Sequence, residues 1–570
     1  MFLPTTRKEM DRLGWSAADV IIVTGDTYID SPFEGAALIG KVLMRHGFRV
    51  GVIAQPDLET AEDIKRLGEP TLFWGVTAGA VDSMIANRTA SGKKRKKDDH
   101  TPGGENTRRP DRAVIAYANL IRKHFKGTLP IVLGGIEASL RRVAHYDFWS
   151  DRIRRSILAD AKADFLLYGM AERSVVELAS HLRSKEDPRA IRGLCYLSPE
   201  KPPDALPLPS FETVASNKEA FTEMFHLFYQ NNDPLTARPL CQKQDTRYLV
   251  QNPPALHLSS EELDAVYDMA FERDLHPYYG KSNEARALDT IRFSITTHRG
   301  CYGECHFCAI AVHQGRTVQY RSVASIVREA ETITRHPLFK GTIADVGGPT
   351  ANMYGIECRK KIREGCCPDK RCLFPKICPS LPVDHKSQIR LLTALASVKG
   401  VKHLFVGSGI RYDMILKDKA HGEPYLETLL RGHVSGQMKI APEHTDNRIL
   451  RLMGKPPAEA LIDFKALFDR VSKRVKKPQF LTYYMIAAYP GCGEKEMASL
   501  KRFAATHLKT TPRQTQIFTP SPSTYGTLMY YTGKDPFSGE GLFVERNFQG
   551  REKQKSIILS NTAFPHKFSP

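Results

Sequence analysis

Three cysteines within eight residues are the most concentrated source of chemistry in the sequence. They are Cys301, Cys305 and Cys308 in the stretch RGCYGECHFCAI, spaced Cys-x3-Cys-x2-Cys. Thiolates bind soft metals, which include zinc, copper(I) and the irons of iron–sulfur clusters. A structural zinc site normally has four protein ligands, whereas a cubane held by three thiolates leaves one iron open. The spacing therefore favours an open [4Fe–4S] site, and zinc completed by His306, His313 or a remote cysteine is the alternative.

A second group of cysteines follows in the stretch ECRKKIREGCCPDKRCLFPKIC, so that eight of the eleven cysteines lie between residues 301 and 378. Its members are Cys358, Cys366, Cys367, Cys372 and Cys378. The stretch is rich in turn residues and poor in apolar ones, which is typical of a loop that folds around metal. Unliganded or redox-active thiols are the alternative for this group.

The elements before residue 195 predict a Rossmann-like parallel-sheet domain, 1–195. Short apolar strands alternate with helical segments, and such strands form a parallel sheet covered on both faces. The expected strands are 19–25, 48–54, 71–76, 130–135 and 163–169, with a helix at 33–46. The polar, turn-rich stretch 88–111 predicts a flexible insert.

A proline-rich connecting segment with helices, 196–285, leads to a second alternation of strands and helices over 286–530. Its six expected strands are 290–297, 341–348, 402–409, 436–443, 480–489 and 514–521. This pattern predicts a partial (β/α)6 barrel, in which the chemistry collects at the carboxyl ends of the strands. The cysteine triplet follows the first of these strands, and residues 531–570 form a C-terminal extension.

A Cys-x3-Cys-x2-Cys loop after the first strand of a β/α barrel resembles the signature of the radical S-adenosylmethionine (SAM) enzymes. The resemblance implies that SAM chelates the open iron and is cleaved to a 5′-deoxyadenosyl radical, chemistry that the cofactors supply. It also implies that Phe307 packs near the adenine, that Gly347 and Gly348 meet the SAM ammonium, that Glu443 contacts the ribose, and that Gly491 borders the adenine.

Longer stretches narrow the match: DVGGPTANMY, SGIRYD, KIAPEHT, LGGIEASLRRVAHYDFWSD and SPSTYGTLMYYTGK resemble the YgiQ family of radical SAM proteins over nearly the whole chain. That family is described by its cluster and fold, and its substrate is unassigned. The resemblance implies a reductant such as flavodoxin or ferredoxin. It also implies a second metal site, a second iron–sulfur cluster or zinc, on Cys358, Cys367, Cys372 and Cys378, with Cys366 left over.

The first domain, by its position, resembles the cobalamin-binding domain of some relatives. The string DDHTPG, 98–103, matches the Asp-x-His-x-x-Gly motif of base-off cobalamin proteins. That motif should follow the first strand, near Thr24 to Ser31, whereas this string lies in the charged insert. We therefore expect the match to be coincidental and cobalamin to be absent.

The chain is basic, with 82 Lys and Arg against 63 Asp and Glu, a net charge of +19. Such a balance suits a polyanionic partner, and RNA is a candidate. A run of arginines beside aromatic residues is either a phosphate contact or a solvated helix paired with local carboxylates; it comprises Arg141, Arg142, Arg152, Arg154 and Arg155. A non-catalytic, metal-stabilised nucleic-acid-binding protein is therefore the alternative function.

The other features of the sequence are weaker. No stretch approaches 18 consecutive apolar residues and the N-terminus lacks the pattern of a secretion signal, so we expect a cytoplasmic protein without membrane contact. The isolated Cys195, Cys241 and Cys492 are expected to be buried rather than nucleophilic. At inferred strand ends, Tyr354, Tyr483, Tyr484 and Arg411 line a substrate pocket or, for the tyrosines, pack in the core.

Overall fold

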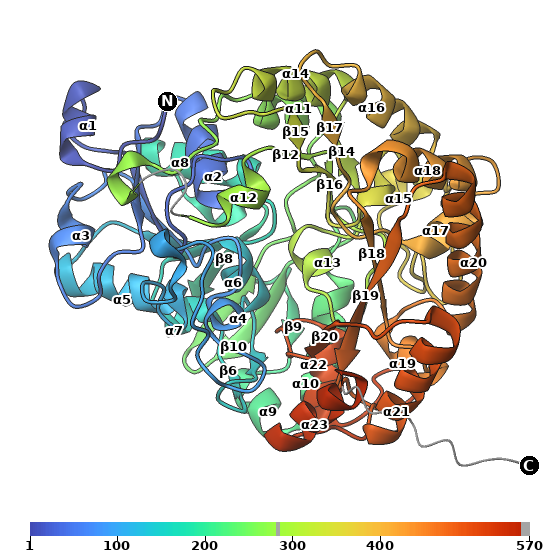
Figure 1. Cartoon of the computed structure of the whole chain (residues 1–570). Helices are drawn as coiled ribbons and strands as arrows, with labels where there is room; N and C mark the ends of the chain where they lie inside the picture. Colours follow the sequence, from blue (N-terminus) through green and yellow to red (C-terminus); the bar gives the residue numbers. More distant parts are fainter. Residues whose placement is uncertain (281–284, 560–570) are drawn as a thin grey trace, which may run out of the picture.

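The computed structural model describes residues 1–280 and 285–559 as a mixed α/β structure with two halves. Figure 1 shows the N-terminal half in blue and cyan beside the C-terminal half in yellow to red. Residues 281–284 of the expected connecting segment and 560–570 of the expected C-terminal extension lie outside the described residues. No helix in the described ranges is long and apolar enough to cross a membrane.

The N-terminal half is built on one nine-stranded sheet with the order β2-β1-β3-β4-β7-β8-β11-β10-β9. Its first five strands are parallel, as the alternating pattern predicted. They are β2 (Val50–Ala54), β1 (Val20–Thr24), β3 (Phe73–Thr77), β4 (Ile131–Leu133) and β7 (Phe165–Leu167). The others are β8 (Leu194–Ser198), β11 (Arg247–Gln251), β10 (Leu240–Gln244) and β9 (Leu206–Leu208).

The sheet runs past residue 195, because β9, β10 and β11 come from the expected connecting segment. β8 pairs antiparallel with β7 and with β11, and β11 pairs antiparallel with β10, whereas β10 and β9 are parallel. The proline-rich stretch therefore contributes the edge of the sheet, where prolines are tolerated because no ladder hydrogen bond is lost. The division of the chain into domains stays a prediction.

Helices cover both faces of the parallel part. On one face Val20 and Ile22 share a core with residues of α2 (Gly35–Arg45) and α8 (Glu172–Ser184). On the other face Ile21 and Val23 pack in the larger core, together with residues of α5 (Ala113–His124). Every residue of β1 is buried, as expected for a parallel strand with a helix layer on each side.

The C-terminal half contains short parallel strands close to the six expected positions. They are β12 (Ser294–Thr296), β15 (Thr342–Ile343), β16 (Asp345–Gly347), β17 (His403–Leu404), β18 (Gln437–Glu443), β19 (Phe480–Ala487) and β20 (Gln514–Ile517). β12 pairs with β16, β15 with β17, and β18, β19 and β20 with one another, all parallel. A parallel bridge between Ile410 and Ile440 joins the third strand to the fourth. The expected first strand, 290–297, is too long, because Leu288–Ile291 forms the short helix α12.

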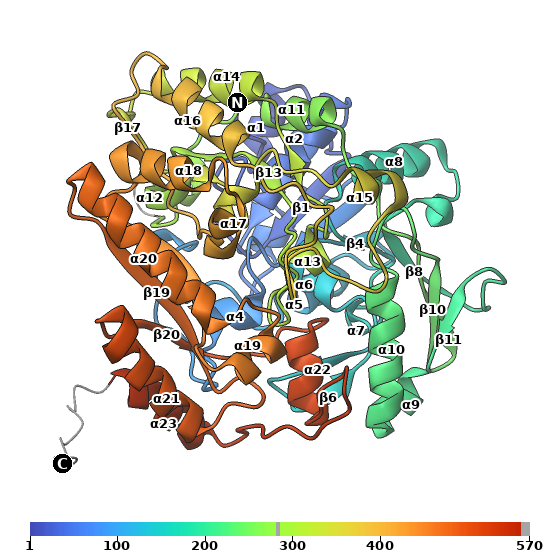
Figure 2. The ribbon, with the colours of Figure 1, turned by 90° about the vertical axis from the view of Figure 1, so that its right-hand side faces the viewer.

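Helices lie on the outer side of these strands, as Figures 1 and 2 show. They include α14 (Val323–Thr334), α16 (Lys386–Ala396), α17 (Tyr412–Lys417), α18 (Gly422–Thr428), α20 (Ala458–Val475) and α21 (Glu494–Phe503). The apolar residues of α20 recur at helical spacing and are buried, which fixes the face that it turns to the strands. The short α13 (Ile310–His313) lies near the centre of the molecule in both views.

Two C-terminal helices close the structure. α22 (Tyr525–Thr532) packs against α10 (Lys218–Gln230) of the N-terminal half, and α23 (Phe548–Leu559) packs against α21. The halves are therefore joined by packing as well as by the chain.

The insert 88–111 packs on the first domain, so the expectation of a free, flexible segment is wrong. The backbone N–H of Thr27 donates to the His100 carbonyl over 2.9 Å, and Gln55 Nε2 donates to Thr101 Oγ1 over 2.7 Å. Arg109 is 3% exposed and pairs with Asp26. The polar composition that predicted a solvated loop instead serves buried ion pairs and hydrogen bonds, which depend on partners far away in sequence.

Candidate functional site

The cysteine triplet lies on a loop whose two ends are held together. β13 (His298–Arg299) pairs antiparallel with β14 (Gln319–Tyr320) at the base of the loop. Above this pair, Gly300 N donates to Gln314 Oε1 over 3.1 Å, and Cys301 N donates to the Gly315 carbonyl over 3.3 Å. Gly300 has a φ of +76° and its missing Cβ would lie 2.1 Å from the Thr317 carbonyl oxygen, so only glycine fits there.

The three thiols are half-buried and reach different neighbours. Cys301 Sγ lies 3.5 Å from Thr350 Oγ1, on the loop after β16, and accepts from the Gly303 backbone N–H over 3.3 Å. Cys305 Sγ lies 3.6 Å from Arg411 Nη1, on the loop before α17. The loop thus contacts the segments that follow β16 and β17.

Burial raises the pKa of the Cys301 thiol. Burial, together with the neighbouring thiols and the Glu443 carboxylate, raises the pKa of Cys308 to about 12. Without metal these thiols are therefore protonated at neutral pH, and binding a metal cluster must release their protons. The guanidinium of Arg411, which contacts Cys305 Sγ, opposes the effect of burial and lowers the pKa of Cys301.

Gly347 and Gly348 end β16 where side chains would not fit. A Cβ on Gly348 would lie 2.7 Å from three atoms of His298, and a Cβ on Gly347 would lie 3.0 Å from Ser408 Oγ. The backbone here approaches its neighbours closely, and Thr350, two residues after Gly348, contacts Cys301. The role in SAM binding that the sequence resemblance implies for the two glycines stays a prediction.

Glu443 and Gly491 also lie at carboxyl ends of strands. Glu443 ends β18 with a φ of +72°, is 8% exposed, and has a pKa raised by burial. A non-glycine residue in this left-handed region is strained, which is common at functional sites. Gly491 has a φ of +90° and its backbone N–H and carbonyl bond to Phe543 and Arg448, while Phe307 packs edge-on to Tyr489.

The donor set fits an iron–sulfur cluster better than zinc. Tetrahedral Zn–S bonds of about 2.3 Å bring the sulfurs within about 4 Å of one another. In the described parts of the chain, two groups of three or more possible ligands have all their ligand atoms within 4.8 Å, and neither contains a cysteine. His306 Nδ1 bonds to the Leu452 carbonyl over 2.7 Å and His313 Nδ1 lies 3.1 Å from Ser139 Oγ, whereas His306 Nε2 is buried without a hydrogen-bond partner among the described residues.

The second cysteine group folds over the same side as the triplet. Cys358, Cys372 and Cys378 share one apolar cluster with Cys301 and Tyr302. Cys378 N donates to the Cys372 carbonyl over 2.8 Å, and Cys372 Sγ lies 3.5 Å from Lys361 Nζ. Cys367 is half-buried.

Cys366 is directed away from that cluster. Its buried thiol bonds to Asp233, which lies between α10 and β10. Cys366 is not part of the apolar cluster that contains Cys358, Cys372 and Cys378. A ligand set of these three with Cys367 stays a prediction.

Several other residues singled out in the sequence have structural partners. The arginine run belongs partly to a short hairpin, β5 (His145–Asp147) and β6 (Arg152–Arg154), rather than to a solvated helix. Arg141 and Arg142 are buried, and Arg154 and Arg155 pair with Asp160. Local pairing, the second of the two interpretations, therefore describes most of the run. Cys195, Cys241 and Cys492 are buried as expected, and Tyr354 and Tyr483 pack in the core.

Sequence patterns did not indicate the cavity of about 460 Å³ between the two halves. Its walls come from one face of the parallel sheet, from α2, and from the ends of β12 and β16 with Gly347 and Gly348. A ligand cavity at the carboxyl edge of a parallel sheet is a common arrangement. The signal that the sequence offered for this cavity was Gly75, a glycine inside the expected strand 71–76.

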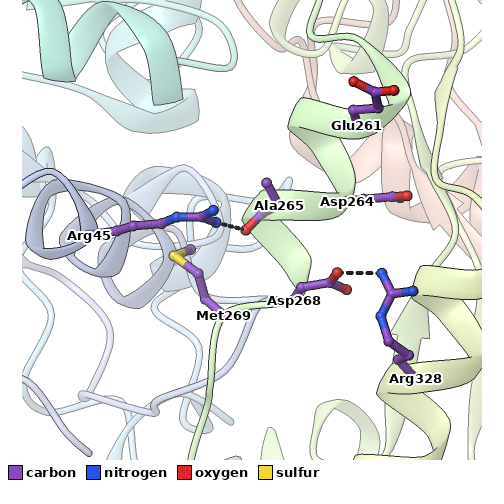
Figure 3. A pocket seen from close by; sticks show the side chains of 7 residues that line it. All are labelled: Arg45, Glu261, Asp264, Ala265, Asp268, Met269 and Arg328. Carbon is purple, nitrogen blue, oxygen red and sulfur yellow. Dashed lines mark hydrogen bonds and ion pairs between the residues drawn. The ribbon is translucent and has the colours of Figure 1, made fainter.

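A second hollow, shown in Figure 3, lies on the surface between α2, α11 (Ser260–Tyr267) and α14. Arg45 donates to the Ala265 carbonyl and Arg328 pairs with Asp268. None of the residues that line it is a cysteine or belongs to a strand. We assign it no function.

The insert brings His100 to the loop after β1. His100 Nδ1 lies 3.1 Å from Glu34 Oε1 and 3.8 Å from Asp26 Oδ2, and Arg109 pairs with Asp26. Burial alone would lower the pKa of His100, but the Glu34 and Asp26 carboxylates raise it to about 9. The three residues form one of the two ligand groups with all atoms within 4.8 Å. Because His100 pairs with Glu34 and Arg109 pairs with both Asp26 and Asp98, ion pairing accounts for the cluster.

These features define a radical SAM protein: residues 2–294 match the family model described as Radical SAM N-terminal. The chain is 56% identical over 98% of its length, and 98% of the relative's, to a UPF0313 protein of Fusobacterium nucleatum. It is 48% identical, again over 98% of both chains, to a UPF0313 protein of Thermotoga maritima. The chain belongs to this family, the YgiQ or UPF0313 family of radical SAM proteins.

The fold is also similar to that of a solved structure, the cobalamin-dependent SAM radical enzyme OxsB with aqua-cobalamin bound. The TM-score is 0.51 at 12% identity, and the alignment covers 95% of this chain and 56% of OxsB. At this identity the similarity concerns the fold alone. The expectation that cobalamin is absent nevertheless lacks support. It rested on the distance in sequence between DDHTPG and the end of the first strand, but the folded insert places His100 beside the end of β1.

Proposed function

We propose that the protein is an enzyme that holds a [4Fe–4S] cluster on Cys301, Cys305 and Cys308 and cleaves SAM reductively. In this proposal β12 and the strands β15 to β20 form a partial (β/α)6 barrel whose carboxyl ends surround the cluster loop. The observation that carries the proposal is the triplet on a closed loop, half-buried, with Arg411 and the bare Gly347–Gly348 backbone beside it.

When bound, the cluster and SAM supply the radical chemistry, in which one electron from a reductant cleaves the sulfonium to methionine and a 5′-deoxyadenosyl radical. The residues of the chain bind and orient the cluster and SAM. Gly347 and Gly348 offer backbone to the SAM ammonium, and Glu443 accepts from the ribose hydroxyls. Phe307 and Gly491 border the adenine. Arg411 balances the charge of the thiolates.

The substrate of this reaction is unassigned. The cavity between the halves reaches Gly347 and Gly348, so a molecule held there would lie next to the proposed SAM site. A reductant such as flavodoxin or ferredoxin is needed for the electron.

The alternative, a non-catalytic nucleic-acid-binding protein, is less well supported. Its main local feature was the arginine run, whose members are largely buried or paired with carboxylates. The net charge of +19 remains its basis.

The test is anaerobic reconstitution followed by incubation with SAM and dithionite. The native chain should form 5′-deoxyadenosine, and Cys301→Ala should not, because removal of one thiolate prevents assembly of the cluster. Cys195→Ala, at a buried cysteine remote from the loop, is the matched control and should retain the product. Undiminished product from Cys301→Ala would reject the proposal.

The same preparation tests the second cysteine site. Iron bound per chain should be about eight if Cys358, Cys367, Cys372 and Cys378 hold a second [4Fe–4S] cluster. About four irons with one zinc would assign zinc to that site, and about four irons without zinc would reject a second metal.

A further inference from the structure

The core layer between the parallel sheet and α2 contains a slot that protein side chains leave open. On β1, Val20 and Ile22 line the cavity, and Phe73 and Val132 line it from β3 and β4. These side chains belong to the core shared with α2 and α8. Protein interiors are normally packed without such space, so an open slot in a core layer requires an explanation.

Gly75 is the residue that opens the slot. It lies in the middle of β3, in register between Ile22 on β1 and Val132 on β4. Its missing Cβ would meet nothing closer than 3.6 Å, an ordinary contact, and its φ is not in the left-handed region. Glycine inside a strand is destabilising by about 0.5–1 kcal/mol relative to alanine, and here neither packing nor backbone geometry requires it.

Other glycines repeat the pattern at the wall and the rim. A Cβ on Gly35, the first residue of α2, would have nothing within 4 Å, and a Cβ on Gly134 would meet its nearest atom at 3.9 Å. Both line the same cavity. Gly35, Gly75 and Gly134 thus surround one cavity, and at none of them would a Cβ clash with the protein. This indicates that a ligand rather than a protein side chain fills the cavity.

The end of the cavity toward the cluster loop is polar. Arg299, 3% exposed, pairs with Glu172 and donates from Nε to the Tyr267 hydroxyl over 3.1 Å. Within the described residues its Nη2 donates no hydrogen bond, and Glu172 Oε2 accepts none. Unpaired buried donors and acceptors are costly, so a ligand that bonds to both would be favoured here.

We infer that the cavity binds a small molecule with a flat, fused aromatic ring system at one end and hydrogen-bonding groups at the other. The ring lies in the slot between the sheet face and α2, where Phe33 and Phe73 supply aromatic contact. The polar part lies beside Arg299 and Glu172 and reaches toward Gly348. Two kinds of molecule carry such a ring on a polar body. One is a corrinoid, in which the ring is the benzimidazole base of the nucleotide tail, and the other is a flavin or adenine dinucleotide.

The test is a titration of the full-length, anaerobically purified protein with hydroxocobalamin, followed by visible absorption, and separately with FAD, followed by fluorescence. The decisive variant is Gly75→Val, whose side chain fills the slot without a clash at Cβ. It should retain the native melting temperature or exceed it, since valine suits a strand better than glycine. It should weaken binding at least ~10-fold, because overpacking a filled slot displaces the ring.

Two further variants serve as controls. Gly75→Ala adds one methyl group and should give an intermediate loss of affinity. Gly432→Val introduces the same side chain at an exposed helical glycine with nothing within 4 Å, and should bind as the native chain does.

Saturable binding of hydroxocobalamin that Gly75→Val weakens would support the inference with a corrinoid as the ligand. The same result with FAD would support it with a dinucleotide. If neither probe binds, or if Gly75→Val binds them as tightly as the native chain, the inference is wrong.

Discussion

Replacement of Gly348 by alanine should weaken SAM binding through a steric clash that the structure defines. The new Cβ would lie 2.7 Å from Cε1, Nε2 and the carbonyl oxygen of His298. The imidazole cannot rotate away freely, because Nδ1 lies 2.8 Å from Thr297 Oγ1 and Nε2 lies 3.0 Å from the Thr350 carbonyl. The end of β16 must therefore move.

Overpacking of this kind costs about 1–3 kcal/mol. If a loss of about 2 kcal/mol falls on the SAM complex, the Kd rises roughly 30-fold. Gly347→Ala should have a smaller effect, since its Cβ would meet Ser408 Oγ at 3.0 Å and Ser408 Cβ at 3.1 Å, which are longer contacts than those at Gly348. Gly409→Ala is the matched control, because a Cβ there has nothing within 4 Å.

The assay is isothermal titration of SAM into anaerobically reconstituted protein, with the melting temperature measured in parallel. The expected order of loss is Gly348→Ala, then Gly347→Ala, then Gly409→Ala with none. A Gly348→Ala variant that matches Gly409→Ala in both Kd and melting temperature would refute the steric argument.

Two other predictions concern charged groups. The pKa of His100 is raised from 6.5 to about 9 in the folded state. Protonated His100 therefore stabilises the docked insert by up to about 3 kcal/mol below pH 6.5, and this stabilisation is lost as the pH rises through 9. The rate of trypsin cleavage in the lysine-rich run 93–97, corrected for the pH dependence of trypsin with a reference peptide, should increase over that pH range in the native chain. His100→Gln should remove this pH dependence. Equal pH profiles in the native chain and the variant would contradict the role of His100. Arg411→Met removes the cation 3.6 Å from Cys305 Sγ and should lower both the iron bound per chain and the cluster's midpoint potential, whereas Arg411→Lys should preserve them. A native potential in the methionine variant would show that Arg411 has no such role.

Local sequence patterns predicted the strands and the cysteine loop well. The strand positions followed from short apolar runs, because each run must be buried wherever it lies in the fold. The triplet followed from spacing, since three thiols within eight residues can approach one cluster whatever the rest of the chain does. Local patterns failed for the insert 88–111, whose polar residues are satisfied by Asp26, Glu34 and Gln55 of the first domain.

The sequence by itself determined the chemistry of the site: the three thiols, the glycine pair that ends β16, and the family to which they belong. The tertiary structure alone decided what surrounds that chemistry. It placed Arg411 against Cys305, turned Cys366 toward Asp233, and set Gly75 opposite α2 so that a cavity opens beside the barrel. These are contacts between residues far apart in the chain, and no local pattern encodes them, because their distances depend on how all the elements pack together.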